Sequence, residues 1–209
     1  MADTAATLAF TTTSAFSIAG LFGALAFAYV GLVKLLPKTA SRIDRLAFVW
    51  LAFDALIHFT YEGSWLYLST FGRTVNGSEG PLADMWKEYA NVDFRWGTAD
   101  PTIVSIEILT VLCAGPLCCY IISQLIRNDP ARHYWIIVLS TAELYGGWMT
   151  FCPEWVTGNP NLDTSNAWGF WVYIVFMNTI WVWVPLWLMW DSYRAIAGSL
   201  RSTHKAKSA

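Results

Sequence analysis

The segment from Thr102 to Ile126 reads TIVSIEILTVLCAGPLCCYIISQLI, and its only charged residue is Glu107. A helix needs roughly 20 mostly apolar residues to cross about 30 Å of hydrocarbon, so this segment is long enough to span a membrane. The whole chain has the same character, since 56% of its 209 residues are hydrophobic and only 13% are charged. A soluble globular protein of this size would carry more charge. The sequence therefore predicts a membrane protein.

Four further apolar stretches occur in the chain, and the second of them is unusually polar. By residue number they cover about 13–36, 46–70, 134–151 and 167–190. A helix can cross a membrane because it satisfies its own backbone hydrogen bonds. We therefore expect an all-α membrane protein, a five-transmembrane-helix bundle in a single domain over residues 1–209. The mixed segment 71–101 is expected to be a loop with an interfacial helix, and residues 153–166 a polar linker.

The distribution of Lys and Arg predicts how the bundle is oriented. Only Arg73, Lys87 and Arg95 lie on the side that holds the N-terminus, and the other ten of the 13 lie on the opposite side. Because Lys and Arg are retained in cytoplasmic loops, we expect a lumenal N-terminus, a lumenal loop at 71–101 and a cytosolic tail at 191–209. The last five residues, KAKSA, fit the Lys-x-Lys-x-x signal that returns membrane proteins to the endoplasmic reticulum. We therefore expect a multi-pass protein of that membrane.

Several kinds of partner are disfavoured by composition. The net charge is -2 and no basic run is present, whereas nucleic-acid binding needs clustered Lys and Arg, so the partners should be membrane lipid or lipid-like molecules. A metal site is not expected either, because the spans contain one His and carboxylates on separate helices without a recognisable ligand spacing. The cysteines are interpreted as helix-packing residues; they are Cys113, Cys118, Cys119 and Cys152.

Ionisable side chains inside the predicted spans are the main functional signal. Each costs about 3 kcal/mol at the centre of a spanning helix, so such residues face a protein interior. They are Asp54, His58, Glu62, Glu107 and Glu143, and Asn178 joins them as a neutral polar group. With a rise of 1.5 Å per residue, all six lie roughly 6–18 Å below the lumenal end of their spans. We therefore expect a shared cavity, and the absence of acids leading to both surfaces disfavours a channel or a proton-coupled transporter.

Spacing along the helices adds detail to this cavity. Asp54, His58 and Glu62 follow one another at intervals of four residues, so they share a helix face and His58 can touch both carboxylates. Asn178 and Trp181 are one turn apart. A lone His or Asn in a membrane more often serves interhelical hydrogen bonding, but the His58–Glu62 pair together with Glu107 favours a reaction site. Asp54 fits either role, as does Glu143.

Five short motifs resemble, in order and spacing, the emopamil-binding protein family. They are HFTYEG at 58–63, MWKEYA at 85–90, EILT at 107–110 followed by Gly115 and Pro116, LYG at 144–146, and FMNTIW at 176–181. The resemblance covers about residues 46–191. The best-known members of this family are Δ8-Δ7 sterol isomerases of the endoplasmic reticulum.

The resemblance implies a five-helix bundle of the EXPERA type with an intramembrane ligand cavity, open to the membrane, and no cofactor. It transfers functional roles to His58, Glu62, Glu107, Thr110, Asn178 and Trp181. It also implies a sterol or related polycyclic terpenoid substrate, inhibition by cationic amphiphiles, and a homodimer as an open expectation. Two positions depart from the family pattern. Glu143 stands where its sterol isomerases tend to have Gln, and Gly147 stands where the animal form has Asp.

The implied reaction shifts a ring double bond by adding one proton and removing another through a tertiary carbocation. Glu62, backed by His58, is the expected proton donor, and the same pair can accept the second proton. Trp181 is expected to face the cation, where a desolvated cation-π contact contributes about 2 kcal/mol or more.

Supporting roles are expected for the other three residues. Glu107 adds negative charge, and Thr110 orients it. Asn178 holds His58 or a carboxylate in place.

Two alternatives stay open at this point. The chain could be an isomerase or cyclase that acts on a terpenoid or modified steroid in a specialised pathway. It could also be a non-catalytic sterol-binding membrane protein, although the complete set of predicted catalytic residues argues against that reading.

Overall fold

Five long helical stretches make up most of the computed structural model, which describes residues 10–208. In chain order they are α1 (Thr12–Leu35); α2 (Arg42–Ile57), η1 (His58–Glu62) and α3 (Gly63–Leu68); α6 (Pro101–Leu109), η2 (Thr110–Ala114) and α7 (Gly115–Ile126); α8 (Arg132–Thr157); and α9 (Ala167–Gly169), η3 (Phe170–Phe176) and α10 (Met177–Ser208). The three η segments are π-helical turns inside otherwise α-helical stretches. Two short helices, α4 (Pro81–Ala90) and α5 (Arg95–Thr98), precede α6. Within residues 10–208 no strand forms, and Asp93 and Leu162 make an isolated β-bridge.

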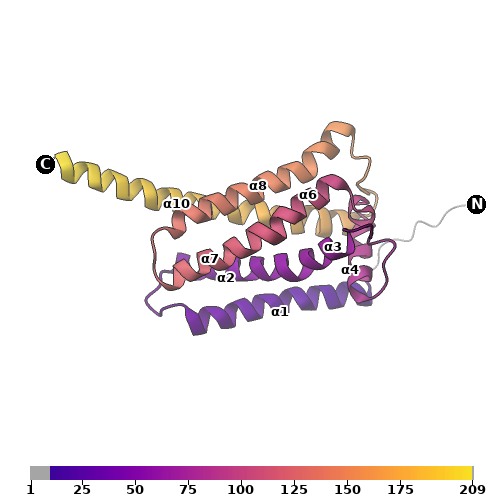
Figure 1. Ribbon diagram of the computed structural model, residues 1–209, viewed down its shortest axis with the longest axis horizontal. Coiled ribbons are helices and arrows are strands. Elements are labelled where there is room, and N and C mark those ends of the chain that lie inside the picture. Colours follow the sequence, from indigo (N-terminus) through magenta and orange to yellow (C-terminus); the bar gives the residue numbers. More distant parts are fainter. Residues whose placement is uncertain (1–9, 209) are drawn as a thin grey trace, which may run out of the picture.

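The long helices lie side by side in one bundle (Figure 1). α2 packs against α1 and α7, and α10 packs chiefly against α8. α4 lies at one end of the bundle, and the C-terminal part of α10 extends beyond the opposite end. An all-helical architecture was predicted from the sequence, and it is confirmed.

Local sequence signals explain where the helices begin. Thr11 and Ser14 form a capping box at the start of α1, in which each side chain accepts a hydrogen bond from the other residue's backbone N–H. The Asp100 side chain accepts from the backbone N–H groups of Thr102 and Ile103, and Pro101 occupies the first position of α6. Such caps satisfy backbone donors that have no partner within the helix.

The bundle has a central apolar core and a second, aromatic core at one end. Phe48, Leu51, Ile121 and Leu139 are at most 1% exposed and hold α2, α7 and α8 together. The aromatic core includes Trp65, Trp86 and Trp96, with Val75 and Ile103. It joins the 71–101 segment, with its helices α4 and α5, to the bundle.

Buried polar contacts also fasten the 71–101 segment. Glu88 of α4 accepts hydrogen bonds from the hydroxyls of Thr11, Ser14 and Tyr173. Arg95 donates to both carboxylate oxygens of Asp93, at 2.9 and 2.7 Å. Burial alone would lower the pKa of Arg95, but its hydrogen bonds and ion pair with Asp93 raise it above the ordinary value. This segment is therefore a folded cap over one end of the bundle.

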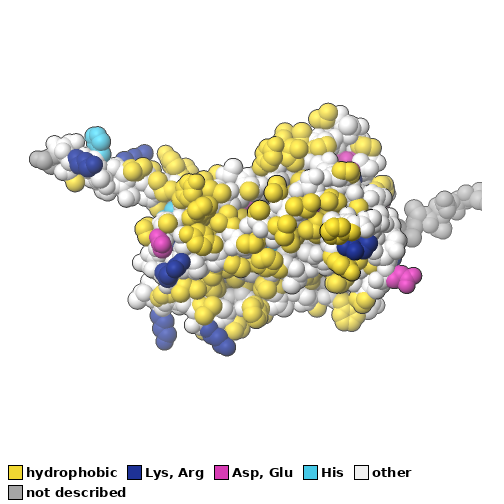
Figure 2. Space-filling view, in the orientation of Figure 1, with side chains coloured by type: hydrophobic (Ala, Val, Ile, Leu, Met, Phe, Trp, Pro, Cys, Tyr) yellow, Lys and Arg dark blue, Asp and Glu magenta, His cyan; other side chains and the backbone are white. Residues whose placement is uncertain are grey.

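Three helices in the described part of the chain are long and apolar enough by their own sequence to cross a membrane: Thr12–Leu35, Pro101–Ile126 and Ala167–Ser208. Side chains such as Phe16, Phe22 and Phe27 on α1 are 67–75% exposed, as lipid-facing residues would be. Figure 2 shows hydrophobic side chains over much of the visible face, and most of its visible Lys and Arg toward the end from which α10 projects. The protein is therefore a helical membrane protein.

Two predicted boundaries differ from the structure. The fourth stretch was expected to end at residue 151, but α8 continues through Pro153 to Thr157. The linker expected from residue 153 therefore begins five residues later in the chain than predicted. The 191–209 tail is helical as far as Ser208 because α10 continues without a break. Residues 1–9 and Ala209, on which the predicted N-terminal orientation and the end of the retrieval signal fall, lie outside the described residues.

Candidate active site

A large cavity of about 1590 Å³ lies between the helices, and its wall is mostly apolar. It exceeds the roughly 300–1,000 Å³ of an ordinary small-molecule pocket. Leu109, Tyr145 and Phe176 line it and are nevertheless 63–65% exposed, so the cavity opens through the side of the bundle. All six predicted site residues line this cavity: His58, Glu62, Glu107, Thr110, Asn178 and Trp181.

The closest polar contact in the cavity joins His58 to Glu62. His58 Nδ1 lies 2.5 Å from Glu62 Oε2, and His58 is only 2% exposed. Both residues belong to the π-helical turn η1. π-bulges often occur at functional sites, where the extra residue in the turn changes the direction of the side chains.

Asp54 lies on the other side of His58. Its Oδ1 atom is 3.2 Å from His58 Nε2, so the predicted contact of His58 with both carboxylates is confirmed. The same oxygen accepts a 2.7 Å hydrogen bond from Nε1 of Trp181, and Oδ2 accepts one from the Cys118 thiol at 3.3 Å. Asp54 is fully buried and does not line the cavity. It therefore lies behind His58 and Trp181, which do line the cavity.

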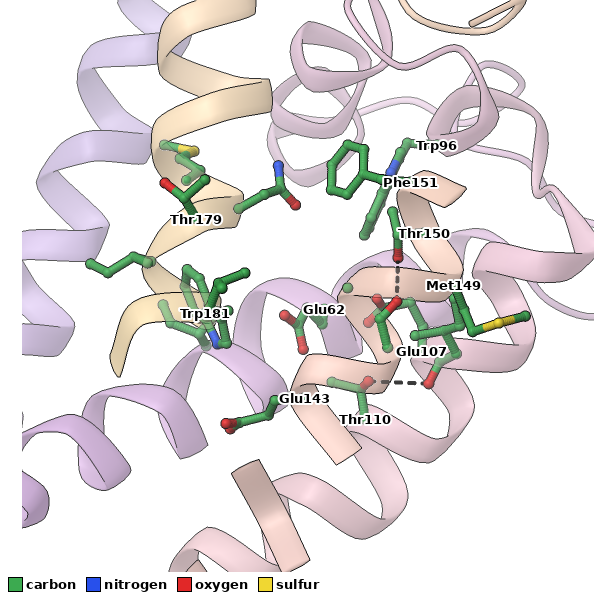
Figure 3. A pocket seen from close by; sticks show the side chains of 18 of the residues that line it. Glu62, Trp96, Glu107, Thr110, Glu143, Met149, Thr150, Phe151, Thr179 and Trp181 are labelled. Atoms are coloured by element: carbon green, nitrogen blue, oxygen red, sulfur yellow. Dashed lines mark hydrogen bonds between the residues drawn. The ribbon is translucent and has the colours of Figure 1, made fainter. Parts of the chain in front are cut away.

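Two further carboxyl groups reach the cavity from other helices. Glu107 is 6% exposed, and its Oε2 atom has no hydrogen-bond partner. Glu143 of α8 has no partner at either carboxyl oxygen. Figure 3 shows Glu62, Glu107, Glu143 and Trp181 around one space, each from a different long helix. The predicted clustering of polar groups from four helices is present.

Two predicted contacts are wrong. Thr110 was expected to orient Glu107, but its hydroxyl donates to the Ile106 carbonyl at 3.1 Å, the usual bond of a Thr to the preceding helical turn. Asn178 was expected to hold His58 or a carboxylate. Its amide instead donates to the Tyr89 hydroxyl at 3.2 Å and to two backbone carbonyls of η3.

Tyr89 was not among the predicted site residues, although it lies in the quoted MWKEYA motif. Burial, with the nearby charge of Asp93, raises the pKa of its phenol above the ordinary value, so it remains a neutral hydrogen-bonding group. Trp86 and Trp96 stack beside it, with ring centroids 5.2 Å apart and planes 6° apart. All three rings line the cavity, so the cap supplies its aromatic end wall.

Residues 81–192, more than half of the chain, match the family model described as EBP: EXPERA (EXPanded EBP superfamily). The chain belongs to the EXPERA family. A 3-beta-hydroxysteroid-Delta(8),Delta(7)-isomerase of Cavia porcellus is 32% identical over 184 residues, which cover 86% of this chain and 77% of that protein. The protein of the same name from Rattus norvegicus is 28% identical, over 88% of this chain and 78% of its own length. Protoglabretal synthase of Citrus sinensis is 27% identical, with 82% and 81% covered.

The resemblance to the emopamil-binding proteins predicted from the five motifs is thereby confirmed, and the EXPERA match extends over most of them. The first motif, with His58 and Glu62, lies before residue 81 and therefore outside the matched part of the family model. The two departures noted in the sequence, Glu143 and Gly147, both line the cavity. Relative to the pattern that the resemblance implied, the cavity wall has a carboxyl group at residue 143 and lacks one at residue 147.

One group of side chains in residues 10–208 has the donor atoms for a metal ion. Polar atoms of Asp54, His58 and Cys118 all lie within 4.8 Å of one another. Asp54, however, already accepts bonds from Cys118 and Trp181. Neither Asp54 nor Cys118 lines the cavity. We interpret the group as a hydrogen-bonded cluster that supports the cavity wall.

Proposed function

We propose that this chain is a sterol isomerase that moves a ring double bond from the Δ8 to the Δ7 position. The observation that carries the proposal is the His58–Glu62 pair, at 2.5 Å, on the wall of an apolar cavity that also exposes Glu107 and Trp181. Two mammalian relatives are named for this reaction. The family relationship and the chemistry of the site therefore favour the same activity.

The reaction needs no redox partner. The electron pair of the C8=C9 bond takes a proton at C9, which leaves a tertiary cation at C8. Loss of a proton from C7 then places the double bond between C7 and C8. One proton enters and one leaves, so the site must supply an acid, a base and stabilisation for a transient positive charge.

The residues can be assigned to these tasks as follows. Glu62, held at His58, is the proposed proton donor to C9. After that transfer the deprotonated pair is the base that accepts the proton released from C7. Glu107 is the second carboxyl group at the cavity and stabilises the cation by its charge. Trp181 offers its ring face to the cation, a contact that contributes about 2 kcal/mol or more when desolvated.

The remaining predicted residues shape the site. Asn178 holds Tyr89, and through it the aromatic end wall. Thr110 lies in the π-helical turn η2, next to Glu107. The apolar wall excludes water, which would otherwise capture the cation as an alcohol.

We further propose that all five long helical stretches span the membrane and that the cavity opens into the lipid. α2–α3 and α8 are at least as long as the apolar helices Thr12–Leu35 and Pro101–Ile126, but they carry Glu62 and Glu143, which face the cavity. The Lys and Arg distribution supports a lumenal cap and a cytosolic α10 end, in the endoplasmic reticulum membrane. A sterol would then enter sideways from the bilayer, and a cationic amphiphile would compete with it as a mimic of the carbocation. A homodimer is a further proposal that rests on the family alone.

The direct test is turnover of a Δ8-sterol by the full chain in detergent, followed by NMR of the product. A Δ7-sterol is expected, and Glu62→Gln should abolish it while sterol binding is retained. Sterol binding without turnover by the unmodified protein would instead support the non-catalytic alternative.

A second candidate function keeps the chemistry and changes the substrate. Isomeliandiol synthase of Melia azedarach and protoglabretal synthase of Citrus sinensis are also similar to this chain. Glu143 favours this candidate, because a carboxyl group without a hydrogen-bond partner at this position of the cavity wall suits a substrate with an additional polar group. Failure on Δ8-sterols together with turnover of an oxygenated triterpenoid would support it.

A further inference from the structure

Asp54 is a carboxyl group that the proposed mechanism leaves without a role. It is fully buried on α2 and contributes nothing to the surface of the cavity. Its two oxygens contact three side chains, His58, Trp181 and Cys118, at 3.2, 2.7 and 3.3 Å, and the carboxyl group of Glu143 lies beside it as well. Two of these three, His58 and Trp181, line the cavity.

Burial of a carboxyl group in a membrane helix is costly, and stability alone does not explain it. A buried charged group can often be replaced by an apolar residue of similar size without loss of stability. The neighbours of Asp54 would suit such a residue, because Leu51 and Ala55 on the same helix belong to the central apolar core. A polar group retained in these surroundings indicates a role in the site.

The contact with Trp181 fixes one particular orientation of the indole. Trp181 packs against Trp50 and Phe53, with ring centroids 5.4 and 6.3 Å away. Packing on two rings does not define which edge of the indole faces α2. The hydrogen bond from Nε1 to Asp54 does define it. It also joins α10 to α2 behind the cavity wall, between residues 127 positions apart in sequence.

The charge of Asp54 has a second consequence for the same ring. A carboxylate that accepts the indole N–H draws the hydrogen toward itself and increases the electron density of the ring. Cations bind to aromatic faces through the negative part of the ring quadrupole. An indole bonded to Asp54 is therefore a better surface for a carbocation than a free indole.

We propose that Asp54 is a positioning residue, which orients the Trp181 indole and the His58 imidazole toward the cavity and makes the indole face more attractive to a cation. The proposal rests on the proposed function, because it assigns Asp54 to the same site. Asp54 itself does not touch the substrate and acts only through these two residues.

Two substitutions separate orientation from charge. Asp54→Asn keeps a carbonyl oxygen that can accept the indole N–H but removes the charge. Asp54→Leu keeps the number and branching of the side-chain heavy atoms and removes both. Trp181→Phe removes the donor on the other side of the bond, and it is combined with Asp54→Leu in a double variant. Asp44→Asn makes the same change near the start of α2, where the side chain bonds to Ser41 outside the cavity, and serves as the matched control.

Each variant is purified as the full chain in detergent, and two quantities are measured. The first is kcat and KM for a Δ8-sterol. The second is the affinity for a steroid carrying a tertiary amine compared with its neutral carbon analogue. We expect Asp54→Leu to lower kcat by about 10-fold or more, as loss of other orienting partners does, with little change in KM. Asp54→Asn should have a higher kcat than Asp54→Leu, but its preference for the amine over the neutral analogue should be smaller than that of the wild type. Asp44→Asn should match the wild type in both kcat and amine preference.

The double variant provides the test of mechanism. If Asp54 acts through Trp181, adding Asp54→Leu to Trp181→Phe lowers kcat by less than it does in the wild type. Independent, multiplicative losses would overturn the proposal, as would wild-type amine preference in Asp54→Asn. If the unmodified protein turns over no Δ8-sterol, the proposed function fails, and the amine comparison alone still decides the role of Asp54. If Asp54→Leu does not fold, the amine preference of Asp54→Asn decides the role of Asp54.

Discussion

Substitution of Gly115 by Ala tests how precisely the bundle holds the His58–Glu62 pair. Gly115 begins α7 and lies against η1. A Cβ atom at this position would be 2.9 Å from Cε1 of Phe59 and 3.3 Å from Cβ of His58. Ordinary carbon–carbon contacts are about 3.5–4.0 Å, so the Phe59 contact must open by roughly 0.6–1 Å.

The direction of this movement determines its effect on the site. Phe59 is 45% exposed and its ring can move outward, whereas His58 is held between Asp54 and Glu62. Both residues belong to the same π-helical turn, so a displacement of Phe59 carries the backbone of His58 with it. A misplacement of about 1 Å can cost about 100-fold in rate, and we expect a loss of about 10-fold for a shift that the exposed ring partly absorbs. Overpacking of this kind costs about 1–3 kcal/mol of stability.

The assay compares kcat for a Δ8-sterol and the melting temperature of the purified variants. Gly23→Ala on α1 is the control, because nothing lies within 4 Å of its added Cβ. Phe59→Ala added to Gly115→Ala removes the ring that is struck, and it should recover part of the activity. Wild-type kcat in Gly115→Ala would refute the argument that this contact positions His58, as would a double variant no more active than Gly115→Ala alone.

Three further predictions address other parts of the site. Glu62→Gln should lower kcat by about 100-fold or more, the usual contribution of general acid–base catalysis, and mass spectrometry should still detect bound sterol; an active Gln variant would remove Glu62 from the mechanism. Trp181→Leu should weaken binding of a cationic amphiphile by about 10-fold or more, since about 2 kcal/mol of cation-π energy is lost, and calorimetry with a neutral analogue should give a smaller change. Glu88→Leu should leave the hydroxyls of Thr11, Ser14 and Tyr173 without their acceptor and cost about 1–3 kcal/mol, seen as a lower melting temperature; an unchanged melting temperature would mean that the cap does not depend on Glu88.

Spacing and depth predicted much of the site because they depend only on helix geometry. Asp54, His58 and Glu62 lie on one helix, so their contacts follow from intervals of four residues. The convergence of Glu62, Glu107 and Glu143 follows from their position in the same half of the membrane, roughly 6–18 Å below the lumenal ends of their helices. Spacing and depth are properties of a single helix, so they can be counted directly along the sequence.

Contacts that depend on tertiary packing could not be predicted in this way. Trp181 was placed beside Asn178, but its hydrogen bond goes to Asp54 on a helix distant in sequence. Asn178 reaches Tyr89 because the 71–101 segment folds back over the end of the bundle as α4. Single-sequence periodicity does not reveal this fold-back.

Backbone geometry explains the remaining differences. The π-helical turns η1, η2 and η3 have no clear sequence signature, yet they occur at or next to site residues. The fourth helix was expected to end at residue 151, shortly before Pro153, a residue type that removes a helical hydrogen bond. α8 nevertheless continues to Thr157, and its end is better marked by Gly158, which adopts a left-handed conformation at φ 85°.

The most direct test of the account is the isotope content of the product formed from an unlabelled Δ8-sterol in D2O. The account predicts a Δ7-sterol with deuterium at C9, formed by the wild type and lost in Glu62→Gln. A Δ7 product without deuterium at C9, or one still formed by Glu62→Gln, would contradict protonation by the His58–Glu62 pair.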